Sequence, residues 1–283
     1  MRLVSFDDAG VLAAGVLVVD QIVPLAALGA PAHSVREVLE RLDADGLAAL
    51  GERAAGEGSG LPLQSVRLRA PVTDPQKIIC LGLNYRDHAA EMGQDEPAAP
   101  LWFAKFANSL AGSGEAIVLP AAHPNYVDYE AELAIVIGRP THRVSPQQAL
   151  DHVAGAMPFN DVSARDLQLQ NQLWTSGKAI DTFAPCGPAL VTMDELANIQ
   201  DLALRTRIDG EVVQEGNTRE QIFGAADVVA WLSRTMTLLP GDIVATGTPA
   251  GVGISKDRFL RAGEQVEVEV EGLGAVANPV RSE

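Results

Sequence analysis

The sequence predicts an α+β protein that is mostly β. Residues 2–25 alternate short apolar runs with turn residues, which is typical of a small antiparallel meander. Residues 202–216 contain two strand-like runs around Asp209-Gly210, a strong hairpin signal. Near the C-terminus, residues 264–271 alternate valine with glutamate, as a half-buried strand does. Those glutamates are most simply solvated.

A helical stretch follows the meander. Ser34 and Glu37 have the spacing of a capping box, and an apolar stripe runs on from there until it breaks near Asp45-Gly46. After the flexible-looking run G-E-G-S-G, the strand S-V-R-L-R leads to the Pro-containing junction A-P-V-T-D-P-Q. We therefore expect a small N-terminal α+β domain at 1–72 and a larger domain at 73–283.

The larger domain opens with a predicted buried strand at 77–81, followed by a helix-like stretch at 87–93. His88 and Glu91 are three residues apart and would share one helical face, where the carboxylate can accept from one imidazole nitrogen and leave the other as a base. Alone, such a pair is more often solvated on a surface. The polar loop at 93–100 would let this helix act as a mobile lid.

Two glutamates and an aspartate form a candidate metal site. Leu133 to Ile137 is an apolar, partly β-branched run, and Glu130 and Glu132 stand at its start. Side chains two apart on a strand project to the same face, so the two carboxylates should lie side by side. Asp161 follows a second apolar segment and would complete an all-oxygen site for Mg²⁺ or Mn²⁺. The simpler alternative is a solvated strand edge.

Three basic residues have both a functional and a structural interpretation. Lys105 lies among apolar neighbours, near Ser109, and either extends its ammonium to solvent or has a partner. Arg165 is expected about one helical turn past Asp161, facing the same pocket, unless it pairs with Asp166 or another surface carboxylate. Lys178 would neutralise an oxyanion or the acidic cluster, unless its partner is Asp181.

Two further segments complete the pattern. Residues 218–234 predict a helix, whose buried side is expected to be Ile222, Phe223, Ala226, Val229 and Leu232. A glycine-rich loop follows at 246–253, where Gly247, Gly251 and Gly253 would let the backbone approach a ligand and Thr246 and Thr248 supply hydroxyl groups. The loop matches neither nucleotide-binding glycine pattern, so no nucleotide is expected.

Bulk properties limit the function. The 37 acidic and 21 basic residues among 283 give a formal charge of −16, which argues against nucleic acid or an anionic membrane as partner. Cys80 and Cys186, the only cysteines, lie in apolar segments and are expected to be free core residues in a reducing compartment. Acidic residues stand where a signal peptide would be apolar, and no apolar run suggests a membrane span, so a cytoplasmic location is expected.

Taken in order, these motifs strongly resemble the fumarylacetoacetate hydrolase superfamily over about residues 76–280: N-Y-x-x-H-x-x-E, E-x-E, N-D-V-S-A-R-D, G-K-x-x-D-T-F-x-P-x-G-P and T-G-T-P-A-G-V-G. The resemblance implies a mixed β-sandwich roll, usually as a homodimer, with a small variable N-terminal domain. It implies a Mg²⁺ or Mn²⁺ site and the following roles: Glu130, Glu132 and Asp161 as ligands, His88 and Glu91 as the water-activating dyad, Lys178 as oxyanion stabiliser, and Arg165, Thr248, Lys105 and Ser109 as substrate contacts.

The resemblance implies a small anionic 2-oxo acid as substrate. The leading hypothesis is hydrolysis of a carbon–carbon bond in an acylpyruvate-like or other 2,4-dioxo acid, with the metal polarising the carbonyl and stabilising the enolate. An alternative at the same site is decarboxylation of oxaloacetate, or hydration or isomerisation of an unsaturated 2-oxo acid. From another class, the chain would be a metal-stabilised binding protein without turnover.

Overall fold

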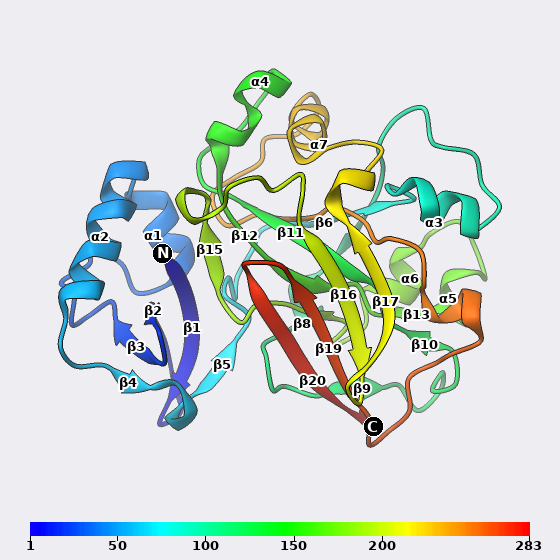
Figure 1. The fold of residues 1–283 in the computed structure, drawn as a ribbon, viewed down its shortest axis with the longest axis horizontal. Coiled ribbons are helices and arrows are strands. Elements are labelled where there is room, and N and C mark those ends of the chain that lie inside the picture. Colours follow the sequence, from blue (N-terminus) through cyan, green and yellow to red (C-terminus); the bar gives the residue numbers. More distant parts are fainter.

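Two β-sheets face each other across a shared apolar core in the computed structural model, which describes all residues from Met1 to Glu283 (Figure 1). The larger sheet has 11 strands and the smaller has five. β11 and β12 of the larger sheet contact β16, β19 and β20 of the smaller one. This mostly β architecture confirms the predicted fold class.

The larger sheet is largely antiparallel and runs in the order β4-β3-β2-β1-β15-β12-β11-β18-β6-β7, with β5 paired to β1. One pair of neighbours, β18 and β6, is parallel. The strands are β1 (Arg2–Asp8), β2 (Val11–Val18), β3 (Gln21–Pro24), β4 (Leu61–Pro62), β5 (Arg67–Arg69), β6 (Ile78–Gly82), β7 (Leu101–Lys105), β11 (Ala131–Ile137), β12 (Val153–Asn160), β15 (Leu190–Thr192) and β18 (Ile243–Ala245).

The smaller sheet runs in the order β17-β16-β19-β20-β9, and two further pairs of very short strands join β10 to β13 and β14 to β8. Asp209 and Gly210 both have positive φ in the turn between β16 and β17, which is the backbone of the predicted Asp-Gly hairpin. These strands are β8 (Leu110–Ala111), β9 (Ile117–Leu119), β10 (Val127–Asp128), β13 (Ser163–Ala164), β14 (Ala184–Pro185), β16 (Ala203–Ile208), β17 (Glu211–Asn217), β19 (Gln265–Val270) and β20 (Gly274–Ser282).

Seven α-helices cover the sheets: α1 (Val35–Arg41), α2 (Ala44–Gly56), α3 (Arg86–Glu91), α4 (Pro146–Ala149), α5 (Arg165–Gln168), α6 (Thr175–Lys178) and α7 (Ala225–Leu232). In Figure 1, α1 and α2 lie beside the N-terminal strands, whereas α3, α5 and α6 lie on the opposite side of the molecule. None of these helices has the length and apolar character that crossing a membrane requires.

Alternation along β11 assigns its two faces to different environments. Leu133 and Ile135 belong to the core shared with the smaller sheet, whereas Ala134 and Val136 belong to a second core on the other face of the strand. Glu132 has the same parity as Ala134, so its side chain projects away from the smaller sheet. Local strand geometry therefore directs the acidic side chains toward the face where α5 and α6 lie.

The N-terminal predictions are largely confirmed. β1, β2 and β3 form the antiparallel meander, and the Ser34 hydroxyl caps α1 by accepting from the Glu37 N–H. The predicted break near Asp45-Gly46 was misplaced, because Asp43 caps α2 by accepting from the Gly46 N–H and the helix has already begun. The predicted domain boundary at 72/73 stays a prediction; β1 pairs with β15, so the larger sheet includes strands from both sides of it.

The predicted helix at 218–234 was too long. Residues 218–220 form a 3₁₀ turn, Gln221 makes a bridge to Tyr85, and α7 begins only at Ala225. The Ile222 N–H donates to the Asn84 backbone oxygen, and the Phe223 N–H donates to the Asn84 side-chain oxygen. These bonds to a distant residue replace the hydrogen bonds that a helix would make there. Val229 and Leu232 are buried, as predicted.

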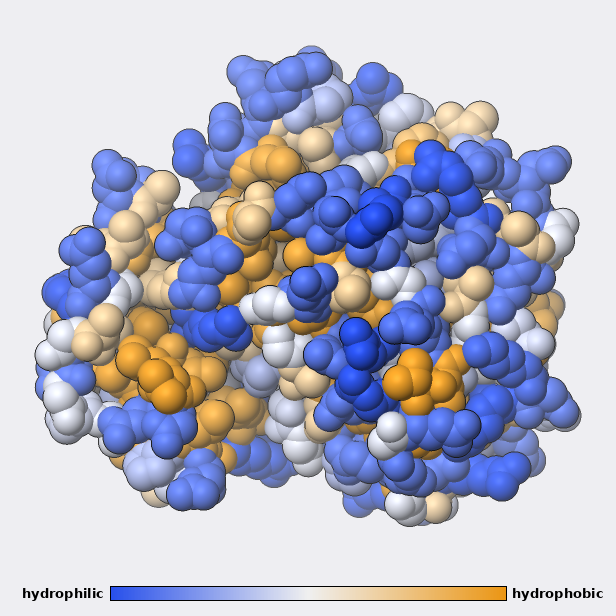
Figure 2. Space-filling view, viewed as in Figure 1, coloured by the Kyte–Doolittle hydropathy of each residue, from blue (hydrophilic) through white to orange (hydrophobic).

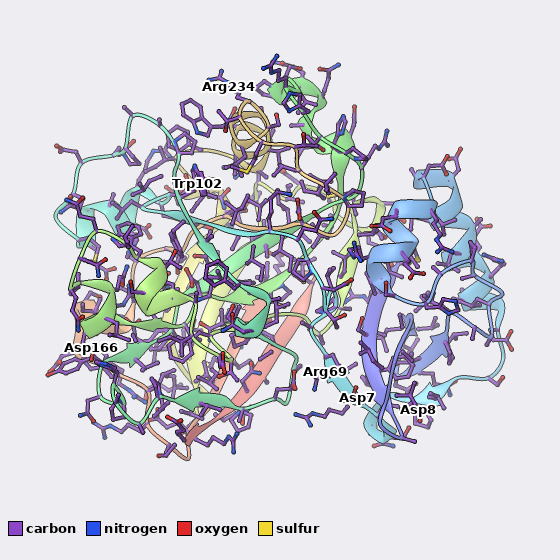
Figure 3. The ribbon with its side chains drawn as sticks, turned by 180° about the vertical axis from the view of Figure 1, so that it is seen from behind. Asp7, Asp8, Arg69, Trp102, Asp166 and Arg234 are labelled. Carbon is purple, nitrogen blue, oxygen red and sulfur yellow. The ribbon has the colours of Figure 1, made fainter.

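The burial of the two cysteines matches expectation. Cys80 and Cys186 are buried and free, in one apolar core. The face drawn in Figure 2 is largely hydrophilic with scattered apolar areas. Arg69 and Asp7 form an ion pair, 3.5 Å apart, and Figure 3 labels both residues near the place where β5 meets β1. The glutamates of β19 are half-exposed, and Glu267 and Glu269 pair with Arg207.

Candidate metal centre and active site

Antiparallel pairing of β11 and β12 brings three acidic residues together. Ala131 pairs with Asn160, so Glu130 and Glu132 at the start of β11 lie beside Asp161, just after the end of β12. One oxygen from each carboxylate lies within 4.8 Å of the others. The side chains are buried, with exposures of 5% for Glu130 and 0% for Glu132 and Asp161. These residues do not form the solvated strand edge that was the simpler alternative.

Glu132 shows that the cluster fits a divalent cation. Its Oε2 accepts from the Gly247 N–H over 2.9 Å, but its buried Oε1 has no hydrogen-bond partner. Burial, followed by the charges of Asp161 and Glu130, raises the pKa of the Glu132 carboxyl well above its usual range. A buried, unpartnered oxygen is costly. Three converging carboxylates suit a hard cation such as Mg²⁺ or Mn²⁺, which would supply the missing partner.

Two buried lysines neutralise part of this acidic cluster. Lys178 Nζ donates to Glu130 Oε2 over 2.8 Å and to Asp161 Oδ2 over 2.9 Å, and Lys105 Nζ donates to Asp161 Oδ1 over 2.5 Å. Although burial acts in the opposite sense, Asp161 and Glu130 raise the pKa of Lys178, whereas burial lowers the pKa of Lys105. Asp181 accepts from Asn108 and is not the partner of Lys178.

Arg165 lies at the start of α5 and links three side chains. Its Nε donates to Asp128 over 2.7 Å, and its two terminal nitrogens donate to Glu130 over 2.6 Å and to Gln168 over 2.9 Å. Although burial alone would raise it, Lys178 and Arg165 lower the pKa of Glu130 to about 2. The expected helical turn from Asp161 was wrong, because β13 lies between Asp161 and α5.

His88 and Glu91 form a hydrogen-bonded pair on α3, as the helical spacing predicts. His88 Nδ1 lies 3.2 Å from Glu91 Oε2, and the other carboxylate oxygen of Glu91 accepts from the Gly251 N–H over 2.9 Å and from the Ser255 hydroxyl over 2.7 Å. The Glu91 carboxylate is therefore fixed by the glycine-rich loop. Its hydrogen bond to Nδ1 leaves Nε2 of His88 to exchange a proton.

A cavity of about 290 Å³ has several of these groups in its wall, but Glu91, Glu132 and Asp161 are not part of the lining. Its walls combine the polar side chains of His88, Glu130, Arg165, Lys178 and Thr248 with apolar ones. Sequence reasoning missed several wall residues: Met92, Gln94, Phe103, Gln168, Leu169 and Trp174. The Phe103 and Trp174 rings meet edge to face, with centroids 5.7 Å apart, and Lys178 Nζ lies 5.2 Å from the Phe103 centroid. Only tertiary contacts identify such apolar wall residues.

Of the other predicted substrate contacts, Thr248, Ser109 and Lys105, only Thr248 lines the cavity. The Thr248 hydroxyl lines the cavity but donates to the Ala131 carbonyl over 2.9 Å. Ser109 is buried, and its hydroxyl donates to the Phe106 carbonyl outside the cavity lining. Lys105 does not line the cavity, and neither does its partner Asp161. Substrate binding by these three residues stays a prediction.

Glycines of the loop at 246–253 pack closely against other parts of the protein. A Cβ on Gly247 would lie 2.8 Å from the Asn84 Cβ, and one on Gly253 would lie 2.1 Å from the Arg258 carbonyl oxygen. The loop contributes N–H groups instead, from Gly247 to Glu132 and from Gly251 to Glu91. It therefore holds both the acidic cluster and the dyad.

The two-sheet sandwich carries three buried carboxylates whose chemistry suits a divalent cation, beside the hydrogen-bonded pair of His88 and Glu91. The family model described as "Fumarylacetoacetate (FAA) hydrolase C-terminal" matches residues 77–281. The chain belongs to this family, and it is an enzyme of the fumarylacetoacetate hydrolase superfamily. The predicted family is thereby confirmed.

Its relatives carry different activities. Oxaloacetate tautomerase FAHD2A, mitochondrial, from Homo sapiens is 44% identical over 224 residues, which cover 78% of this chain and 71% of that protein. The structure of maleylpyruvate hydrolase from Sphingobium sp. SYK-6 in complex with manganese(II) ion and pyruvate is 31% identical, with a TM-score of 0.83 over 100% of this chain and 99% of that one. The 2-hydroxyhepta-2,4-diene-1,7-dioate isomerase from Mycobacterium marinum is 34% identical, with a TM-score of 0.79 over the same shares.

Proposed function

We propose that the protein is a divalent-metal-dependent tautomerase of oxaloacetate or a closely similar 2-oxo acid. The proposal shifts the emphasis from hydrolysis, which the sequence motifs favour. The relatives at 44% identity are oxaloacetate tautomerases, whereas the hydrolase and isomerase structures are 31% and 34% identical. All three activities occur among these relatives, so the proposal also needs support from the site geometry.

The observation that carries the proposal is the position of His88. It lines the same cavity as Glu130 and Lys178, it is close enough to Glu130 to lower the pKa of that carboxyl, and Glu91 holds its Nδ1. An imidazole can accept and return a proton near neutral pH. Tautomerisation needs that transfer alone: one proton leaves carbon 3 and one arrives on the 2-oxo oxygen, or the reverse, and no bond between heavy atoms breaks.

Glu130, Glu132 and Asp161 would hold the metal, which when bound supplies Lewis-acid polarisation of the 2-oxo group. The chain's own cations complement it. Arg165 and Lys178 line the cavity, and their positive charges favour binding of an anionic substrate there, although the protein as a whole has a formal charge of −16. Ordinary salt screens the distant surface charge beyond about 10 Å, but it screens contacts inside a pocket much less.

The test follows the ultraviolet absorbance of enol-oxaloacetate in the presence of Mg²⁺ or Mn²⁺. We expect the wild type to accelerate loss of the enol without releasing pyruvate, and His88→Ala to lose at least about 100-fold in kcat/KM. His142→Ala is the matched control, because His142 is an exposed histidine outside the cavity and should not matter. Equal enol decay with and without enzyme would refute the proposal.

Hydrolysis of an acylpyruvate is the second candidate, and Lys178 favours it. An ammonium has three N–H donors, and Lys178 uses two of them on Glu130 and Asp161. The third remains for a tetrahedral oxyanion formed when water, deprotonated by His88, adds to the distal carbonyl. Cleavage of the bond between carbons 3 and 4 would then yield pyruvate and a carboxylic acid. Pyruvate release from acylpyruvates, with none from oxaloacetate, would select this activity.

Pyruvate release from oxaloacetate would instead indicate decarboxylation. In that case His88→Ala should damage decarboxylation less than hydrolysis, because only hydrolysis needs an activated water. The homodimer and the cytoplasmic location expected from the sequence stay predictions. Light scattering of the purified protein tests the first of these directly.

A further inference from the structure

Gln214 is the one buried residue of β17, with 2% exposure, and it belongs to the smaller sheet rather than to the elements that carry the candidate ligands. The pairing of β16 with β17 shifts register between Thr206 and Arg207, so β17 bulges next to Gln214. Such bulges redirect a side chain out of the regular pattern. Here the redirected amide reaches across the sandwich core to the start of β11.

All four hydrogen-bonding positions of the Gln214 amide are used. Its Oε1 accepts from the Ala131 N–H over 2.9 Å and from the Thr206 hydroxyl over 3.0 Å. Its Nε2 donates to the Thr248 hydroxyl oxygen over 2.7 Å and to the Pro249 carbonyl over 2.9 Å. The opposite orientation of the amide would face donor with donor at Ala131, so the contacts determine which way it points.

One arm of this amide holds the candidate metal ligands. Ala131 lies between Glu130 and Glu132, and its N–H bonds to Gln214 while its carbonyl accepts from Thr248. Gln214 and Thr248 are also bonded to each other. The three residues thus form a closed ring of hydrogen bonds through the peptide groups of Ala131. Because that residue joins the two glutamates, its backbone orientation sets how their carboxylates face one another.

The other arm reaches the acid–base dyad. Nε2 holds the Pro249 carbonyl, and two residues later the Gly251 N–H donates to Glu91, the partner of His88. Gly251 also packs directly on Gln214, since a Cβ at Gly251 would lie 3.3 Å from the Gln214 Cα. Gln214 is therefore the common support of the loop that orients Glu91 and of the strand that carries two metal ligands.

We propose that Gln214 is a positioning residue that holds the Glu130–Glu132 pair in register with the loop at 246–251, and so sets both metal affinity and the orientation of His88. It touches neither the metal nor the substrate. The proposal rests on the metal site proposed above. Replacing a residue that orients metal ligands without binding the metal itself typically changes metal affinity or activity by about 10- to 100-fold.

The experiment measures Mn²⁺ binding to the purified full-length chain by calorimetry, with metal alone and no substrate. Gln214→Met keeps the side-chain length but removes all four hydrogen bonds of the side-chain amide. We expect it to raise the Mn²⁺ dissociation constant about 10- to 100-fold. Thr206→Val is the milder variant, since it removes one bond to the amide oxygen and leaves the bond to Ala131 in place. It should weaken binding by a smaller factor, and it covers the case in which Gln214→Met does not fold.

The matched control is Asn278→Ala. Asn278 is 1% exposed in the same sheet, and its amide donates to the Gly112 and Glu115 carbonyls. None of these three residues lines the cavity or belongs to the acidic cluster. It should lower the melting temperature but leave the Mn²⁺ dissociation constant unchanged. Unchanged Mn²⁺ affinity in folded Gln214→Met or in Thr206→Val, beside normal wild-type binding, would overturn the positioning role alone. A wild type that binds no Mn²⁺ would overturn the metal site and this role together.

Discussion

The backbone N–H of Gly247 donates to Glu132 Oε2, while Oε1 of the same carboxylate is buried without a partner. The glycine-rich loop thus holds one oxygen of the group and leaves the other for a ligand. Glu130 and Asp161 differ in this respect, because lysine or arginine contacts both oxygens of each. Glu132 is therefore the carboxylate whose environment most requires a cation.

Metal affinity should rise with pH. Burial and the neighbouring carboxylates raise the pKa of Glu132, so in the metal-free protein this group retains its proton to a higher pH than in the unfolded chain, where the pKa is about 4.3. The group therefore lowers the free energy of unfolding as pH rises from that value through the folded pKa. A cation must displace the proton, so affinity should increase about tenfold per pH unit within this window.

Calorimetry of Mn²⁺ binding in buffers of different ionisation enthalpy measures the released proton. Glu132→Gln should remove the release, because an amide does not titrate in this range. Proton release that persists undiminished in Glu132→Gln would assign it to another group.

Chelation should lower thermal stability and activity together. A ligand that binds only the folded state at 100 times its dissociation constant adds about 2.7 kcal/mol to the free energy of unfolding. We expect a chelator to lower the melting temperature of the wild type, and Glu132→Ala to abolish that response. Glu211→Ala, at an exposed glutamate, should respond as the wild type does. Scanning calorimetry with and without chelator decides, and an equal response in all three proteins would contradict the site.

Arg165→Ala should be strongly destabilising. Removing the guanidinium leaves Asp128 and Glu130 buried without that partner, which typically costs about 3–5 kcal/mol. Arg165→Lys should recover only part of this, since one ammonium lacks the planar fork that reaches Asp128, Glu130 and Gln168 together. Urea denaturation measures both variants. Arg219→Ala, which breaks an exposed pair with Asp201, is the control and should cost below about 1 kcal/mol.

Gly82→Ala should disturb the cavity wall. A Cβ at Gly82 would lie 2.2 Å from the Trp174 ring, and both residues line the cavity. The ring must shift, at a cost of about 1–3 kcal/mol. We expect KM to rise more than kcat falls, because the wall moves while His88 stays in place. Gly58→Ala is the control, since nothing lies within 4 Å of its added Cβ. Steady-state kinetics in which both variants match the wild type would show that Trp174 does not limit the substrate's space.

Local sequence patterns correctly predicted the features that depend on contacts between residues close in sequence. The Asp209-Gly210 hairpin, the Ser34 helix cap and the i, i+3 contact of His88 with Glu91 all depend on short-range geometry, and all three were found. The helix at 218–234 failed because Asn84, far away in sequence, captures the N–H groups of Ile222 and Phe223. Periodicity along one segment carries no information about such distant partners.

The sequence alone determined the residue types of the site and the faces of β11, because alternation along a strand directs Glu130 and Glu132 to one side. Their meeting with Asp161 also required the register of β11 on β12, which pairs residues about 30 apart in sequence. The sequence left two partners open for Lys178, and the tertiary structure selects Glu130 and Asp161 over Asp181. Tertiary structure alone decided that Arg165 binds Asp128 and that Gln214 reaches Ala131 across the sandwich. These contacts join different sheets and loops, and long-range packing alone brings such groups within hydrogen-bonding distance.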